Sequence, residues 1–305
     1  MRNLLTLLFL WLLAIAGKAE SVQSVGVSVS DLSNPFFQTM AKEVVSQLKI
    51  RLGYQPQVIV RSSAYDVNRQ IAQLEEFIDH KVDIIILVAA HVDQISPTLE
   101  KAKRTGIKIV AVDVNAQGAH GTITTDNVQA GEVACEFLAQ QLGGEGNFVV
   151  INGPPVSSVL ERVAGCKSVL NNYPDIKLLS EQVNGTGSYE GGLEAMTLLM
   201  ESFGEIDAVF AINDPSAAGA EQAAKQAGRK GFIIGSVDGA PTAFAAIARN
   251  SPWWLGSSAQ FPDQMAARAV EMAIEMMHGN MPSPATQLIP STFIHRGNVE
   301  AFKGW

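Results

Sequence analysis

The segment from Ser30 to Phe37 combines small polar side chains with two adjacent aromatic rings, directly after an apolar run. A sugar presents hydroxyl groups around its rim and C–H groups on its faces, so a site for it needs polar and aromatic side chains together. The segment therefore predicts carbohydrate binding. Its candidate ligand contacts are Ser30, Asp31, Asn34, Phe36 and Phe37.

Polar side chains also follow several later apolar runs. A carboxylate can accept hydrogen bonds from two hydroxyl groups, and a guanidinium donates several in one plane. Side-chain amides both donate and accept, as sugar hydroxyls do. We therefore add six residues to the predicted site, namely Asp113, Asn115, Arg162, Asn213, Asp238 and Gln260.

Each of these residues has a simpler structural explanation. Asn, Asp and Ser at such positions commonly cap the following helix, and we assign that role to Asp126, Asp214 and Asp263. Asp113 and Asp238 are followed by loop residues, which argues against capping. The two phenylalanines could instead fill the core. Arg162 could pair with a helix neighbour, although adjacent Glu161 would not face it on a helix.

The first nineteen residues are typical of a secretory signal peptide. Arg2 supplies the positive start, 4–16 form an almost uninterrupted apolar run, and 17–19 carry small residues at the positions that signal peptidase inspects. The apolar run is shorter than the ~20 residues that span a bilayer. We predict a signal peptide at 1–19, a periplasmic protein and no direct membrane insertion.

The net charge limits the possible binding partners, and the two cysteines raise the question of a disulfide. Without Arg2 and Lys18, the 22 basic residues become 20 against 30 acidic ones, so the formal net charge moves from −8 to −10. Such a chain repels phosphate backbones, and we expect no nucleic-acid partner. Cys135 and Cys166 would lie in an oxidising compartment, and the sequence leaves open whether they form a disulfide or stay buried thiols.

Short apolar runs alternate with amphipathic stretches along the whole chain. Strands are predicted at 25–29, 57–60, 84–88, 108–112, 148–151, 208–212 and 232–236. Helices are predicted at 36–52, 67–80, 95–103, 128–142, 161–171, 189–203 and 217–227. This alternation is typical of an α/β fold with parallel sheets flanked by helices, and the length favours two lobes. In such folds ligands bind at the carboxyl ends of the strands, where the polar residues stand.

Several short motifs occur in a characteristic order. They are Ser-x-x-x-Asn-Pro-Phe-Phe at 30–37, Thr-Asp-Asn at 125–127 with Gly131, Glu-Arg at 161–162 with Gly165, Val-Phe-Ala at 209–211 with Asn-Asp at 213–214, Asp-Gly at 238–239, and Ala-Gln at 259–260 with Pro-Asp-Gln at 262–264. Together they resemble the ribose-binding protein family of periplasmic sugar receptors. The resemblance covers about 25–279.

The resemblance implies a type I periplasmic binding protein, in which two Rossmann-like lobes joined by a three-strand hinge close over one sugar. The N-terminal lobe would comprise 20–125 and 261–289, and the C-terminal lobe 126–260 and 290–305. The ligand would be a monosaccharide or polyol, and the closed form would deliver it to the membrane permease of an ABC importer. We expect no cofactor and a monomer.

Two positions depart from the family's pattern. Val114 and Asn115 follow the aspartate of the fourth strand, where ribose receptors have an arginine. The aromatic residue that the family places in the second lobe falls near Gly187, with Tyr189 as a candidate substitute. A pocket with one arginine and one ring fewer would select another pentose, a hexose or a linear polyol.

Other functions find less support in the sequence. The five histidines are scattered without metal-ligand spacing, and no phosphate-binding loop is complete, so we expect no enzyme. A closer alternative is a periplasmic sensor that presents its closed form to a chemoreceptor or histidine kinase. Trp253 and Trp254 could pack at a lobe surface or form a partner contact, and the sequence favours neither.

Overall fold

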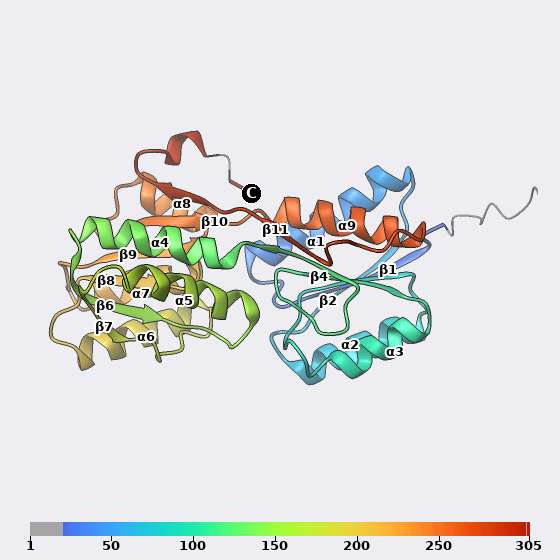
Figure 1. Cartoon of the computed structure of the whole chain (residues 1–305), viewed down its shortest axis with the longest axis horizontal. Helices are drawn as coiled ribbons and strands as arrows, with labels where there is room; N and C mark the ends of the chain where they lie inside the picture. Colours follow the sequence, from blue (N-terminus) through green and yellow to red (C-terminus); the bar gives the residue numbers. More distant parts are fainter. Residues whose placement is uncertain (1–20, 303) are drawn as a thin grey trace, which may run out of the picture.

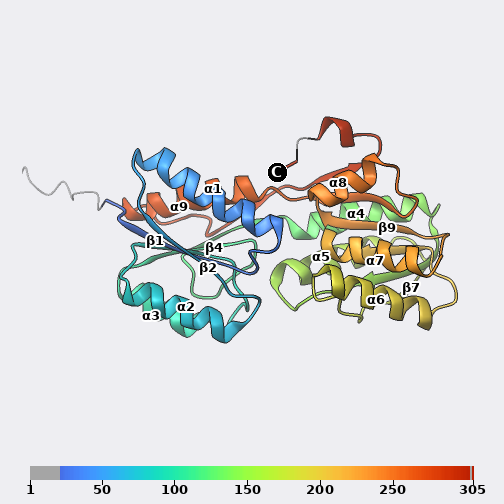
Figure 2. The ribbon, with the colours of Figure 1, turned by 180° about the vertical axis from the view of Figure 1, so that it is seen from behind.

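The structure is a computed structural model that describes residues 21–302 and 304–305, so the predicted signal peptide lies outside the described residues. Figure 1 and Figure 2 show two halves that lie side by side, each built on one six-stranded sheet. Helices cover both faces of each sheet. The predicted fold class, two Rossmann-like α/β lobes, is confirmed.

The N-terminal sheet is parallel throughout, with the strand order β11-β5-β4-β3-β1-β2. Its strands are β1 (Ser24–Val29), β2 (Gln57–Ser62), β3 (Ile84–Leu87), β4 (Lys108–Val112), β5 (Gly121–Thr125) and β11 (Thr286–Ile289). Four helices cover it, namely α1 (Pro35–Leu52), α2 (Val67–Asp79), α3 (Ser96–Arg104) and α9 (Pro262–Met277). Because both faces are covered, the central strands carry runs of Val and Ile.

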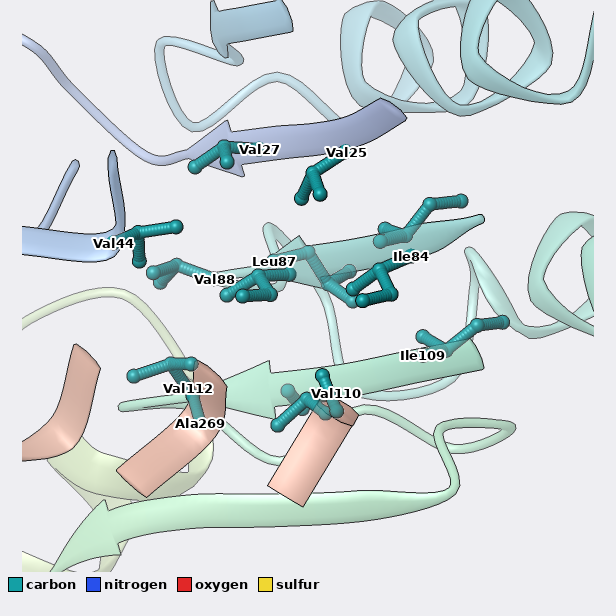
Figure 3. Close-up of a cluster of buried hydrophobic side chains, with 14 of the residues drawn as sticks. Val25, Val27, Val44, Ile84, Leu87, Val88, Ile109, Val110, Val112 and Ala269 are labelled. Atoms are coloured by element: carbon teal, nitrogen blue, oxygen red, sulfur yellow. The ribbon is translucent and has the colours of Figure 1, made fainter. Parts of the chain in front are cut away.

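Figure 3 shows how these strands build the core of the N-terminal half. Side chains of β1, β3 and β4, among them Val25, Ile84 and Val110, pack against one another and against Val44 of α1 and Ala269 of α9. All five side chains are inaccessible to solvent. Because these strands are parallel neighbours, their carboxyl ends lie together at one edge of the sheet.

The C-terminal sheet has the order β12-β10-β9-β8-β6-β7. Its strands are β6 (Glu145–Ile151), β7 (Asp175–Ser180), β8 (Ala208–Ala211), β9 (Ile233–Asp238), β10 (Trp254–Ala259) and β12 (Thr292–His295). Its helices are α4 (Asn127–Gln141), α5 (Ser157–Leu170), α6 (Tyr189–Ser202), α7 (Asp214–Gln226) and α8 (Pro241–Ala248), and a short 3-10 helix, η1 (Val299–Ala301), follows β12. Strand β12 pairs antiparallel with β10. The other strands of this sheet are parallel, and β12 is the exception because it enters directly from β11 of the other sheet.

Strand β6 shows the two-faced burial of this sheet. Phe148 and Val150 belong to the core formed with α4 and α5. Val149 and Ile151 belong to the core formed with α6, α7 and α8. Successive side chains of a strand point to opposite faces, so one apolar run supplies both cores.

Helices α4 and α5 approach each other unusually closely. A Cβ atom on Gly131 would lie 2.0 Å from the carbonyl oxygen of Arg162, and one on Gly165 would lie 2.1 Å from that of Val128. The disulfide Cys135–Cys166 joins the same two helices, with its Cα atoms 5.1 Å apart. The question that the sequence left open is thus settled in favour of the disulfide.

The chain passes between the halves three times, after β5, after β10 and between β11 and β12. We propose lobe boundaries at these passages, as the sequence predicts. Trp253 and Trp254 are both buried in the C-terminal core, where their indole N–H groups donate to the carbonyl of Arg229 and to Ser236 Oγ. Both side chains are therefore core residues, which differs from the two roles that the sequence suggested.

Candidate functional site

A pocket lies where the two halves meet, at the carboxyl ends of the strands. We call it the inner pocket. It is lined by nine of the eleven predicted site residues, Ser30, Asn34, Phe36, Phe37, Asp113, Arg162, Asn213, Asp238 and Gln260. The strands position them, because parallel strands end at one edge of each sheet and the two edges face each other.

The aromatic wall comes from the start of α1. Asn34 caps this helix, its Oδ1 accepting from the backbone N–H of Phe36 at 2.9 Å. The rings of Phe36 and Phe37 meet edge to face with centroids 5.2 Å apart. Both rings also belong to the N-terminal core, so the core explanation and the pocket explanation hold together.

Asp113 supplies an unpaired acceptor. Its backbone has a positive φ of 66° and is fixed by hydrogen bonds to Ile123 and Thr124. Its Oδ1 is buried and has no hydrogen-bond partner among the described residues. Burial raises the pKa of the carboxyl group to about 6, the nearby Arg162 opposes the rise, and Asp238 adds to it. A buried acceptor of this kind calls for a donor from outside the protein.

Hydrogen bonds within the protein hold the side chain of Arg162 in place. Its Nε donates to Asn127 Oδ1 and its Nη1 donates to the carbonyl of Ile212, both at 2.9 Å. Its Nη1 lies 3.8 Å from Asp238 Oδ1. The side chain does not pair with Glu161. These contacts fix the guanidinium plane, which leaves its remaining N–H groups for a ligand.

Asp238 and Gln260 form the seam between the sheets. Gln260 Nε2 donates to Asp238 Oδ1 at 2.7 Å, and its Oε1 accepts from Thr125 Oγ1 at 2.9 Å. Burial raises the pKa of Asp238 to about 6, against the lowering effects of Arg162 and Gln260. Thr125 ends β5 and Gln260 follows β10, so this chain of hydrogen bonds ties both halves at the pocket.

Two of the three predicted helix caps are wrong. Asp126 does cap α4, accepting from the N–H of Gln129. Asp214 instead lies inside the first turn of α7 and is fully buried, where it accepts from Ser236, Ser257 and the N–H of Ala240. Asn213 is the cap, and it also lines the inner pocket. Asp263 lies in the first turn of α9, too late to cap it.

Two predicted site residues do not line the inner pocket. The carboxylate of Asp31 accepts from the N–H and the hydroxyl of Ser33, in the turn before α1. The backbone N–H of Asn115 donates to Ser157 Oγ at 2.9 Å, which links the two halves. Both residues follow strands, but neither contributes to the lining of the inner pocket.

Tyr65 lines the inner pocket although the sequence reasoning missed it. It follows β2 in a left-handed conformation, with a φ of 59°, and its ring lies 6.4 Å from that of Phe37. Partial burial and the nearby carboxylate of Asp31 raise its pKa, so its hydroxyl stays protonated. The available signal was weak, because Tyr65 stands five residues beyond the predicted strand 57–60 and three beyond the observed end of β2.

The last residue, Trp305, packs behind the site. Its ring lies edge to face with Phe36 at 5.7 Å, and its Nε1 donates to the carbonyl of Asp238 at 3.2 Å. In Figure 1 and Figure 2 the C-terminus lies between the two halves. Trp305 thus contacts one pocket residue of each half, whereas the sequence analysis assigned 290–305 to the C-terminal lobe alone.

The side chains that line the inner pocket are of kinds that bind a small polar ligand. They are acceptors, donors and flat apolar surfaces, which match a polyhydroxylated molecule. Among residues 21–302 and 304–305, no three His, Cys, Asp or Glu side chains are grouped to hold a metal ion. Within the same part of the chain, none of the helices is both long and apolar enough to cross a membrane.

Comparison with known proteins identifies the family to which the chain is similar. The family model described as periplasmic binding protein domain matches residues 25–281. A xylitol-binding protein of Mycolicibacterium smegmatis is 33% identical over 79% of this chain and 68% of its own length. The ribose import binding protein of Bacillus subtilis is 32% identical over 84% of this chain and 82% of its own.

Solved structures agree. The periplasmic binding protein of the arabinose ABC transporter from Shewanella sp. ANA-3, bound to L-arabinofuranose, superposes with a TM-score of 0.83 at 25% identity, over 92% of this chain and 94% of that one. The relatives are binding proteins, as the expectation of no enzyme requires. The chain therefore belongs to the periplasmic binding protein family, and its resemblance to the ribose-binding proteins is confirmed.

Proposed function

We propose that the protein captures a monosaccharide or polyol in the inner pocket and delivers it to the permease of an ABC importer. The observation that carries the proposal is the buried Asp113 Oδ1 without a partner among the described residues, set beside Arg162 and Asp238. Donor hydroxyls on adjacent carbons would satisfy such acceptors, and C–H groups of the same molecule would lie on Phe36. Relatives named for xylitol and ribose support this class of ligand.

Capture would work by closure of the lobes. Asp113 and Phe36 belong to the N-terminal half, whereas Arg162 and Asp238 belong to the C-terminal half. A ligand that contacts both sets binds the closed form better than the open one, and this difference in affinity shifts the population toward closure. The signal peptide at 1–19 would bring the chain to the periplasm. Delivery to a chemoreceptor or histidine kinase stays the alternative.

The direct test is binding to a panel of sugars and polyols. We expect at least one of D-ribose, D-xylose, L-arabinose, D-allose, xylitol and myo-inositol to raise the melting temperature and to give a saturable heat in calorimetric titration. Small-angle scattering should show a smaller radius of gyration with that ligand. No binding across the panel, together with no small molecule released from natively purified protein, would refute the proposal.

A pair of matched variants isolates the aromatic wall. Phe36→Leu keeps apolar bulk but removes the flat ring, and it should weaken binding by about 2- to 12-fold, since an aromatic contact contributes about 0.5–1.5 kcal/mol beyond its area. Phe148→Leu makes the same change in the C-terminal core, away from the pocket. It should lower stability and leave affinity unchanged.

A further inference from the structure

A second, larger cavity adjoins the inner pocket. It measures about 330 Å³, and we call it the outer cavity. Residues from both halves line it, from the turn before α1 and from the starts of α6, α7 and α8. Four residues line both spaces, namely Asn34, Tyr65, Gly187 and Asp238. The two spaces therefore adjoin each other, and one molecule could extend from the inner pocket into the outer cavity.

The inner pocket has room for a single small guest. It measures about 60 Å³. This is less than a fifth of the about 330 Å³ of the outer cavity. Because the outer cavity borders the inner pocket at four shared residues, a second ring attached to a sugar held by Asp113 and Arg162 would have room there.

The outer cavity persists although the halves already touch. The backbone N–H of Asn115 donates across the interface to Ser157 Oγ at 2.9 Å. Val156 packs against the cores of both halves. The outer cavity is thus present in a form in which the lobes are already in contact.

Gly187 keeps the passage between the two spaces free of a side chain. It has a positive φ of 69°, a conformation that strongly favours glycine. A Cβ atom there would lie 3.4 Å from Asn213 Nδ2 and 3.7 Å from Pro154 Cδ, at the wall of the inner pocket. Gly187 lines both spaces, so at this position the inner pocket opens toward the outer cavity.

The lining of the outer cavity suits a sugar ring. Tyr65 of the N-terminal half and Tyr189 of the C-terminal half are 41% and 42% exposed, so their rings are free to contact a ligand. Three prolines add flat aliphatic surfaces, and Asp31 and Glu190 supply carboxylates. Rings and prolines fit the C–H faces of a sugar, and carboxylates accept from its hydroxyls.

We propose that the outer cavity is a second sugar subsite, so that the protein takes up a disaccharide whose one ring occupies the inner pocket and whose other ring occupies the outer cavity. The inference rests on the proposed function, because the first ring is held by the inner pocket. Tyr65 and Tyr189 would contact the second ring. Asp31 does not line the inner pocket, but it lines the outer cavity and would contact the second ring there.

Calorimetric titration of the full mature chain tests the proposal. The monosaccharides are D-xylose, L-arabinose, D-glucose and D-galactose, and the disaccharides are xylobiose, cellobiose, maltose, lactose and melibiose. We expect at least one disaccharide to bind at least as tightly as its own monosaccharide. Thr242→Trp, at an exposed position of the outer cavity, should weaken that disaccharide by about tenfold or more and leave the monosaccharide within about twofold.

Leu198→Trp is the matched control, because Leu198 is exposed on α6 and lines neither space. It should change neither affinity. Monosaccharide binding without any disaccharide binding would overturn the second subsite and leave the proposed function standing. Disaccharide binding that Thr242→Trp leaves unchanged would overturn it as well. If no sugar of either kind binds, the proposed function fails together with the subsite.

Discussion

Asp113→Asn should stabilise the ligand-free protein and weaken ligand binding. Asp113 is 6% exposed, and burial raises the pKa of its carboxyl group from 3.8 to about 6. Each pKa unit corresponds to about 1.4 kcal/mol, so keeping this carboxylate ionised at pH 7 costs the folded protein up to about 3 kcal/mol. Asparagine removes the charge, keeps the shape and tolerates the positive φ of 66° at this position.

The same substitution removes the ionised acceptor that we propose for the ligand. Hydrogen bonds to charged groups contribute about 1.5–3 kcal/mol each, so affinity should fall by about 10- to 150-fold. Denaturant titration of the ligand-free protein and calorimetry with the ligand measure the two effects separately. A gain in stability with a loss of binding is the signature of a residue retained for function.

Asp175→Asn is the matched control. Asp175 is an exposed aspartate at the start of β7, at the opposite end of that strand from the pocket edge, and its replacement should change neither quantity measurably. If Asp113→Asn lowers the free energy of unfolding by about 1 kcal/mol or more, the magnitude of one hydrogen bond, the carboxylate is a structural acceptor. If affinity is unaltered, Asp113 does not contact the ligand.

Three further predictions concern the disulfide, pH and closure. Cys135→Ser combined with Cys166→Ser should lower the free energy of unfolding by about 3–4 kcal/mol, the loop entropy expected for a separation of 31 residues, as measured by denaturant titration; an unchanged value would contradict it. The pKa values of Asp113 and Asp238 are raised from 3.8 to about 6, so the free energy of unfolding of the ligand-free protein should rise as the pH is lowered from about 6 to 3.8. Over the same pH range the sugar affinity measured by calorimetry should fall. An affinity that does not change with pH would exclude ionised acceptors. Ser157→Ala removes a hydrogen bond between the lobes and should weaken ligand binding by about 2- to 12-fold without touching the pocket acceptors; unchanged affinity would mean that this bond forms equally in the open state.

The expected elements and the observed ones differ for identifiable reasons. Strand β4 has the predicted bounds, and the long amphipathic helices begin and end within a few residues of expectation. Strand β5 (Gly121–Thr125) and strand β7 (Asp175–Ser180) were missed because their threonines, glycine and charged residues interrupt an apolar run. Helix α9 was missed although its apolar face is buried in the N-terminal core. Local composition is a weaker signal than tertiary burial in such segments.

The sequence by itself determined which residues stand at strand ends, because hydrophobic periodicity is a local property and the carboxyl ends of parallel strands share an edge. That reasoning places Asp113 and Asp238 at sheet edges, and the resemblance to the ribose-binding proteins added Arg162 of α5 and joined the three into one site. Only the tertiary structure decided which side chains meet across the two halves. It brought Tyr65 and Trp305 to the pocket, buried Asp214 beneath it, joined the cysteines and left the outer cavity open at Gly187. These outcomes depend on distances through space between residues far apart in the chain, which no local pattern encodes.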